Sequence, residues 1–276
     1  MAITAADVNK LRQITGAGMM DCKNALTEAN GDFDAAIDIL RKKGQKVAAK
    51  RADRDATEGL VIAKVTADGT RGVLVCTNCE TDFVAKNADF TAMAERIAGI
   101  ALEKNLDTID ALKAAAYDSN GLTVAEKLIE QTGVIGEKID ISACHALTAG
   151  FVYAYNHPGN KVASLVGLNK TGFETAAKDV AMQVAAMGPI ALDKASTPQS
   201  VIDKELEIGK ELAIQEGKPA DMAEKIAHGR LNKFFKESTL LAQEFIKDNK
   251  LSVEQYLKSV DKDLTCTGFK RHSLTV

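Results

Sequence analysis

One order of predicted elements occurs twice along the chain, and this repetition limits the folds that the chain can adopt. Residues 57–79 hold two β-rich runs around Asp68–Gly69, and residues 150–168 hold two more around Pro158–Gly159. Turn residues between two such runs predict a β-hairpin. A helix that carries a phenylalanine near its start follows each hairpin. We interpret this order as an internal duplication of a hairpin and a helix that covers it.

Each of these helices has apolar residues at helical spacing and therefore one face for a core. The first, from about Asn87, carries Phe90, Met93, Ala94, Ile97 and Ile100, and the second carries Phe173, Ala176, Val180, Met182, Val184 and Met187. Helices at 107–131 join the two units, and the strand at 137–149 is expected to join the second sheet. The predicted fold class is α+β, with related antiparallel-sheet and helix subdomains at 57–135 and 136–197.

The pattern of apolar residues and glycines in residues 1–45 predicts a small bundle of three short helices. Thr4 caps the first helix, with Asp7 three residues later as in a capping box. Asp32 caps the third helix, and Gly44 is expected to end it. Because so few residues enclose only a marginal core, we expect a binding module that is attached to a larger body.

The next segment, residues 46–56, is rich in lysine and arginine and is interpreted as a basic linker, solvated and partly helical. An RNA-binding arm is the alternative interpretation. Asp53 and Asp55 dilute the positive charge that such an arm needs.

Residues 198–238 interrupt the second unit with charged helical runs that break at Gly217–Pro219. This pattern predicts an antiparallel helical hairpin, a coiled-coil insertion that projects from the body. Its narrow apolar stripe consists of Val201, Leu206, Leu212, Met222, Ile226 and Leu231. Residues 239–276 then predict C-terminal helices and a closing strand of the second subdomain.

The composition excludes several classes of protein. The net charge of −3 argues against nonspecific nucleic-acid binding, and the absence of tryptophan argues against a base-stacking platform. No apolar run approaches the roughly 20 residues of a membrane span. The first residues lack the basic and apolar regions of a secretory signal. The five cysteines are then expected to be reduced thiols in a cytoplasmic protein.

The sequence contains no recognisable catalytic machinery. Cys76 and Cys79 allow three interpretations: a thioredoxin-like redox pair, half of a zinc site, or small side chains in a half-buried strand. No second ligand pair accompanies them, and the four histidines have neither metal-ligand nor triad spacing. Phosphate-binding loops and nucleophile elbows are also absent. We therefore expect no enzyme activity, no metal and no cofactor.

The stretch "TDFV", Thr81 to Val84, places an aromatic residue where the chain leaves a strand. Thr81 or Asp82 can accept backbone N–H bonds in the turn. Phe83 is then either folded under or displayed. A displayed phenylalanine beside an aspartate has the composition of an interaction hot spot.

Several stretches resemble one known family. "TGAGMMDCKNALTEANGDFDAAI" near the N-terminus and "NCETDFVAKN" after the first hairpin are similar to the two signature stretches of bacterial elongation factor Ts. "EGKPADMAEKIAHGRLNKFFKE" resembles the coiled-coil hairpin of that family, and "TGFKR" resembles its last strand. The resemblance covers essentially the whole chain, in order.

The resemblance implies a guanine-nucleotide exchange factor for elongation factor Tu (EF-Tu), a GTPase. The family's N-terminal unit is similar to ubiquitin-associated (UBA-like) domains and docks on the GTPase domain of EF-Tu. By match, Asp82 and Phe83 of the motif Thr81–Val84 would press between helices of that domain, disturb its Mg²⁺ and phosphate site and so release GDP. Met19 and Met20 are further candidates for partner contact.

The second subdomain would contact another domain of EF-Tu. Some relatives carry a histidine in the helix where this chain has Gln183, which is therefore a candidate contact of its own. Two other functions stay open at this point: a thiol oxidoreductase that uses Cys76 and Cys79, and a UBA-type adaptor that acts through residues 1–45 alone. The sequence leaves open the partner of the helical hairpin and whether the complex is one pair or a dimer of pairs.

Overall fold

The centre of the fold is a pair of antiparallel sheets stacked face to face. The computed structural model describes residues 3–118 and 121–275, and within them each of these two sheets has three strands. The first contains β1 (Glu58–Val65), β2 (Arg71–Cys79) and β3 (Asp140–Thr148) in that order. The second contains β4 (Phe151–Asn156), β5 (Val162–Leu168) and β8 (Cys266–Ser273). The predicted α+β class and both predicted hairpins are confirmed.

The facing surfaces of the sheets pack closely because their side chains are small or branched. They bury Val61, Ala63, Leu74, Cys76, Ala143, Val152, Ala163 and Leu165. A Cβ atom on Gly72 would lie 2.8 Å from Leu165 Cδ2 and 2.9 Å from Val152 Cγ1. Asn156 also bonds the edge of β1, since its Oδ1 accepts from Ala63 N at 2.8 Å and its Nδ2 donates to Ala63 O at 3.0 Å. An asparagine of the second sheet thus takes the place of a neighbouring strand.

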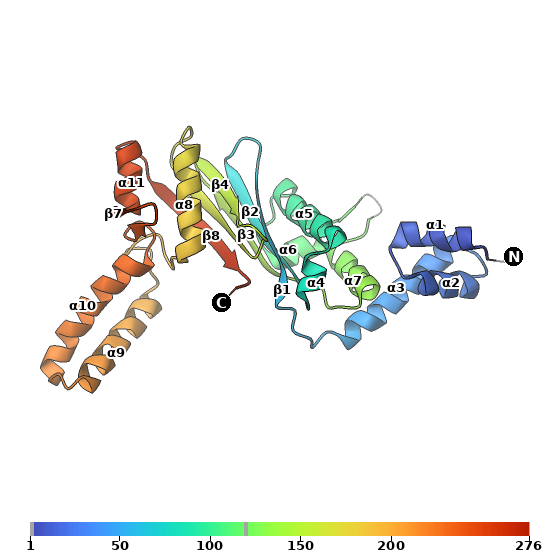
Figure 1. Ribbon diagram of the computed structural model, residues 1–276, viewed down its shortest axis with the longest axis horizontal. Coiled ribbons are helices and arrows are strands. Elements are labelled where there is room, and N and C mark those ends of the chain that lie inside the picture. The colour runs from blue at the N-terminus through green and yellow to red at the C-terminus, as the bar shows by residue number, and fades with distance from the viewer. Residues whose placement is uncertain (1–2, 119–120, 276) are drawn as a thin grey trace.

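Helices cover the outer face of each sheet (Figure 1). On the first sheet lie α5 (Ala88–Glu103), α6 (Ile109–Ala114) and α7 (Val124–Ile135), and on the second lie α8 (Glu174–Met187) and α11 (Val253–Val260). Asn87 caps α5, so the helix begins where the sequence predicts it, and the predicted apolar face of that helix is buried. The layers therefore run helix, sheet, sheet, helix.

The predicted place of the strand at 137–149 is wrong. It forms β3, which pairs with β2 in the first sheet, where Val75 faces Cys144 and Thr77 faces Ile141. A division at 135/136 would separate β3 from its sheet. The third strand of the second sheet is β8, which comes from the end of the chain. Strand pairing across so many residues leaves no local pattern in the sequence.

The N-terminal bundle consists of α1 (Ala5–Thr15), α2 (Met19–Glu28) and α3 (Phe33–Lys50) around a small core that includes Leu11, Leu26 and Ala36. Both predicted caps are confirmed: Thr4 and Asp7 form a capping box, and Asp32 accepts from Ala35 N. The similarity of this bundle to UBA domains stays a prediction.

The predicted end of the third helix at Gly44 is wrong, because α3 continues to Lys50. Gly44 instead lies where α3 crosses α7, against Gly133. A Cβ atom on Gly133 would lie 2.4 Å from the Cα atom of Gly44. The glycine thus permits a close helix crossing that joins the bundle to the body, and residues 46–50 of the expected linker are helical.

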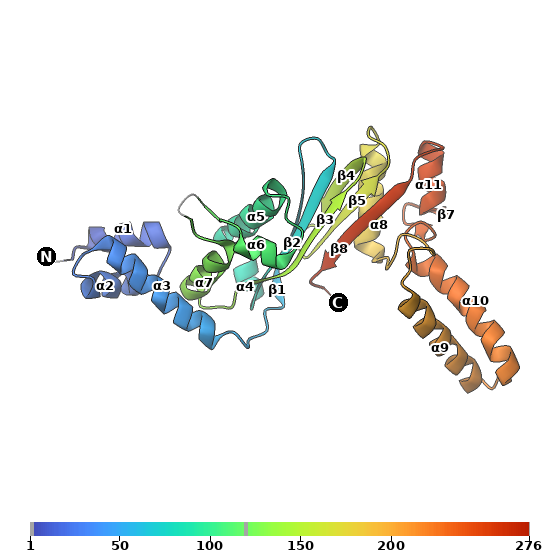
Figure 2. The same cartoon turned by 180° about the vertical axis from the view of Figure 1, so that it is seen from behind.

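The predicted helical hairpin is confirmed as α9 (Gln199–Gln215) and α10 (Ala220–Ser238), with Gly217 at φ 77° in the turn. The bundle and this hairpin lie at opposite ends of the molecule (Figure 2). The predicted apolar stripe is only partly correct, since Leu231 is buried but Leu212 and Met222 are exposed. The seam instead buries the small residues Gly209, Ala213, Ala223 and Ala227. Small residues let the helices approach and leave the larger side chains outside.

Residues 239–276 are only partly as predicted. The closing strand β8 and one helix, α11, are confirmed, but the segment before α11 forms the short paired strands β6 (Glu244–Phe245) and β7 (Asp248–Ser252) and not a further helix. Among the described residues, no helix combines the length and the apolarity that crossing a membrane requires.

The glycine crossing predicts different effects for two similar substitutions. Gly133→Ala should lower the free energy of unfolding by about 1–3 kcal/mol, because its methyl group overlaps α3. Gly44→Ala is the matched control, since its methyl group would meet Ile129 O at 3.5 Å and Gly133 Cα at 3.7 Å, which are ordinary contacts. It should be neutral or gain up to about 1 kcal/mol from helix propensity. Urea titrations followed by circular dichroism measure both, and equal stabilities would contradict the crossing.

Candidate functional site

Phe83 is displayed on the surface. The chain leaves β2 at Cys79 and forms the one-turn helix α4 (Asp82–Ala85), which Thr81 caps by accepting from Val84 N at 3.5 Å. Ala85 is buried and Val84 is half-buried against the core under α5, whereas Phe83 is 81% exposed. Of the two alternatives for Phe83, the structure therefore selects display. The inward side of α4 is already occupied by Val84 and Ala85.

Asp82 lies beside Phe83 as an ionised carboxylate. Lys86 Nζ donates to Asp82 Oδ2 at 2.7 Å, one helical turn further on. This hydrogen bond, with the charge of Lys86, lowers the pKa of Asp82. The exposed end of the motif thus combines an aromatic ring and a negative charge.

Side chains outside the motif hold it in place, and no sequence pattern predicts them. Glu137 accepts from the backbone N–H groups of Glu80 and Thr81 at 3.1 and 2.9 Å and from Thr81 Oγ1 at 2.6 Å. Glu80 in turn accepts from Lys138 N at 2.6 Å and from Arg51 Nη1 at 2.8 and 2.9 Å. The hydrogen bond from Lys138 N lowers the pKa of Glu80. These contacts join segments far apart in the sequence, so no local motif announces them.

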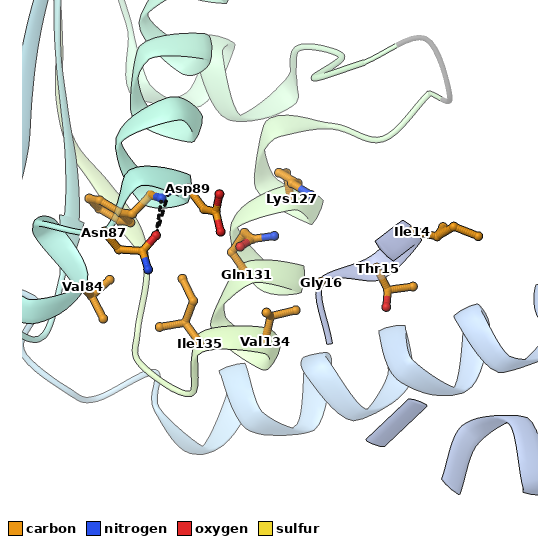
Figure 3. A pocket seen from close by; sticks show the side chains of 11 residues that line it. Ile14, Thr15, Gly16, Val84, Asn87, Asp89, Lys127, Gln131, Val134 and Ile135 are labelled. Atoms are coloured by element: carbon orange, nitrogen blue, oxygen red, sulfur yellow. Dashed lines mark hydrogen bonds between the residues drawn. The ribbon is translucent and has the colours of Figure 1, made fainter. Parts of the chain in front are cut away.

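A cleft of about 360 Å³ lies between the N-terminal bundle and the body (Figure 3). Lys127, Gln131 and Val134 follow one side of α7 along it, with Asp89 at the start of α5 and Gly16 at the end of α1. Val84 and Ile14 also line the cleft. It therefore links the motif at residues 81–84 to the bundle.

The bundle also exposes apolar side chains of its own. Met19 and Met20 occupy the first turn of α2 and are exposed, as is Ile14 at the end of α1. Ile14 follows the buried Leu11 at helical spacing, yet it is exposed. Exposed methionines offer flexible and polarisable surface, which suits partner contact. That Met19 and Met20 bind a partner stays a prediction.

Gln183 is not on the surface. Its side chain is 0% exposed, between α8 and the β6–β7 turn. Its Oε1 accepts from Ile246 N at 2.9 Å, and its Nε2 donates to Glu244 O at 3.0 Å and to Gln243 Oε1 at 3.2 Å. The prediction of a direct partner contact by Gln183 therefore does not hold for this structure. The residue instead fixes the turn that exposes Ile246.

The cysteine pair is not a redox centre. Cys76 points into the layer between the sheets, and Cys79 points into the core under α5. Side chains on opposite faces of one strand cannot form a disulfide. Burial raises the pKa of both thiols, that of Cys79 to about 12. Nor do the described residues contain a cluster of histidine, cysteine or carboxylate side chains that could hold a metal ion.

Comparison with known proteins gives one consistent family. A family model described as "Elongation factor TS" matches residues 80–275. Elongation factor Ts of Christiangramia forsetii is 58% identical over 274 residues, which cover 99% of this chain and 98% of the relative. The protein of the same name from Flavobacterium psychrophilum is 55% identical with the same coverage, and that of Porphyromonas gingivalis is 46% identical over 99% of both chains.

The cysteine geometry predicts slow thiol chemistry. Because the thiol pKa values are raised, the thiolate fraction at pH 8 lies below that of a free cysteine, so Cys76 and Cys79 should react with a thiol reagent only after unfolding. Labelling in native buffer and in denaturant, read by mass spectrometry, tests this. Rapid native labelling of either cysteine, or a Cys76–Cys79 disulfide, would contradict it.

The burial of Gln183 predicts that Gln183→Ala acts on stability. Removing the amide leaves Ile246 N–H and Glu244 C=O without their partner, which should cost about 1–3 kcal/mol in the free energy of unfolding. Gln215→Ala, at an exposed position near the end of α9, is the matched control and should change it by less than about 0.5 kcal/mol. Equal urea midpoints for the two variants would show that the hydrogen bonds of Gln183 do not contribute to stability.

Proposed function

The chain belongs to the elongation factor Ts family, and we propose that it acts in translation by binding EF-Tu in its GDP form and promoting release of the nucleotide. Free GTP then occupies the empty site. The chain supplies binding energy and no chemistry of its own, and it acts in the cytoplasm, where translation elongation takes place.

One observation carries the proposal: Phe83 is displayed beside the ionised Asp82 on a turn that other side chains hold in place. Leaving an aromatic ring in water forgoes roughly 1.5–3 kcal/mol of burial energy. A partner that buries the ring recovers this energy at one point of the interface, which is how a hot spot works. Because the turn is already ordered, little conformational entropy is lost on binding.

The proposed mechanism is a linkage between two binding events. If the chain binds nucleotide-free EF-Tu more tightly than its GDP form, GDP must bind the complex more weakly by the same factor. Phe83 acts as a wedge between helices of the GTPase domain, and Asp82 contributes a charged hydrogen-bond acceptor next to it. A small displacement suffices, because Mg²⁺ in the partner's site tolerates little departure from octahedral geometry.

The shape of the chain supports contact with two parts of EF-Tu. The bundle and α4 lie toward one end, while the second sheet lies toward the other (Figure 1). We assign the GTPase domain to residues 1–45 and 81–84, with Met19 and Met20 as further contacts, and another domain of EF-Tu to the second sheet and its helices. If the chain acted as an adaptor through residues 1–45 alone, the exposure of Phe83 would have no function.

Phe83→Ala should separate binding from nucleotide release. Loss of a hot-spot contact of about 2 kcal/mol lowers the rate of release roughly 30-fold, while the N-terminal bundle still binds. Stopped-flow release of a fluorescent GDP from EF-Tu, over a range of concentrations of this protein, measures both quantities. Ile214→Ala, at an exposed apolar position on α9, is the control and should leave the rate unchanged.

If wild-type protein accelerates release and Phe83→Ala does so equally well, the wedge assignment is wrong and another surface drives exchange. If wild-type protein has no effect on release, the proposed function itself fails.

A further inference from the structure

Beside the motif, each of two glutamates accepts hydrogen bonds from the backbone of the segment that contains the other glutamate. Glu137, in the loop between α7 and β3, accepts from the backbone N–H groups of Glu80 and Thr81. Glu80 accepts from the backbone N–H group of Lys138 at 2.6 Å. We call this reciprocal arrangement of residues 80–81 and 137–138 the carboxylate clamp.

The carboxylate clamp begins where the sheet ends. Pairing of β2 with β1 stops at Cys79, which faces Glu58. The N–H groups of the next residues, Glu80 and Thr81, therefore lie beyond the strand ladder, and the Glu137 carboxylate accepts from both. Hydrogen bonds to a charged acceptor are shorter and stronger than neutral ones. The backbone is thus fixed for two residues beyond the strand, up to Thr81, which caps α4.

The same carboxylate also fixes the cap itself. Thr81 Oγ1 donates to Glu137 Oε1 at 2.6 Å, so its lone pairs remain available to the N–H group of Val84. The orientation of Thr81 sets where α4 begins, and α4 sets the direction of Phe83. The clamp does not touch Phe83, and it acts on that ring only through the backbone.

A third segment, residues 51–54 directly after α3, is hydrogen-bonded to the carboxylate clamp. Arg51 Nη1 donates to both carboxylate oxygens of Glu80, and Lys138 Nζ donates to Ala52 O at 2.7 Å and to Arg54 O at 3.0 Å. The chain that leaves the N-terminal bundle therefore meets the motif at this point. The clamp therefore couples the position of the bundle to the position of Phe83.

We propose that Glu137 is the positioning residue of the exchange motif: by holding the backbone of Glu80 and Thr81, it keeps Phe83 displayed in the direction in which it enters the partner. The inference rests on the function proposed above. Without Glu137 the turn samples many conformations. Ordering the turn on binding then costs conformational entropy, which reduces the binding energy available for nucleotide release.

The first measurement uses the free chain and does not depend on EF-Tu. In Glu137→Ala, amide hydrogen exchange at Glu80 and Thr81 should be about tenfold faster, the factor that loss of one charge-assisted hydrogen bond gives. The amides of Phe90 and Ile97 in α5 should keep their protection, which shows that the variant is folded. Glu137→Gln retains acceptor capacity and should restore most of the protection. Glu103→Ala, which removes an ion pair with Arg96 on α5, is the control.

The second measurement is the rate of fluorescent GDP release from EF-Tu. Glu137→Ala should lower the maximal rate about tenfold with a much smaller change in the half-saturating concentration, and Glu137→Gln should recover most of it. If Glu137 acts through the aromatic ring, adding Glu137→Ala to Phe83→Ala should cause no further loss, because the two changes remove one and the same contact.

Unchanged release by Glu137→Ala, with active wild-type protein, overturns the positioning role and leaves the proposed function intact. Full additivity of Glu137→Ala and Phe83→Ala overturns it as well, because the glutamate would then act elsewhere. No acceleration by wild-type protein overturns the proposed function and this inference together.

Discussion

The packing of the two sheets against each other is the constraint on which the rest of the structure depends. Gly72 lets the first sheet approach Leu165 and Val152 of the second, and Asn156 binds the edge of β1. Once these faces are buried together, each outer face needs its own helical cover, which α5 to α7 and α8 with α11 provide. The bundle and the helical hairpin lie at the two ends of the molecule (Figure 2).

This arrangement presents the motif at residues 81–84 on an ordered surface. Phe83 stands on a turn that is braced from two directions, by the end of the first sheet and by the loop before β3. A flexible loop with the same residues would have to be ordered during binding, and that entropy would reduce the energy available to displace a nucleotide. An exchange factor therefore gains from a rigid display of few residues.

The features that could be predicted from the sequence are local. Asp68–Gly69 and Asn87 determine a turn and a helix start through contacts within a few residues, and Thr4 with Asp7 does the same for α1. The errors concern choices between distant partners. Gly44 has the local features of a helix end, yet it serves a crossing with Gly133, and the strand at 137–149 pairs with β2 because the end of the chain fills the place next to β5.

The same distinction holds for the candidate site. By itself, the sequence determined most of the helices and both central hairpins, the motif of residues 81–84 and, through resemblance, the family. Only the tertiary structure decided that Phe83 is displayed, that Gln183 is buried and that Glu137 holds the turn. The physical reason is that a helix cap or a hairpin turn is stabilised within one segment, whereas the exposure of a side chain depends on which distant segments occupy the space beside it.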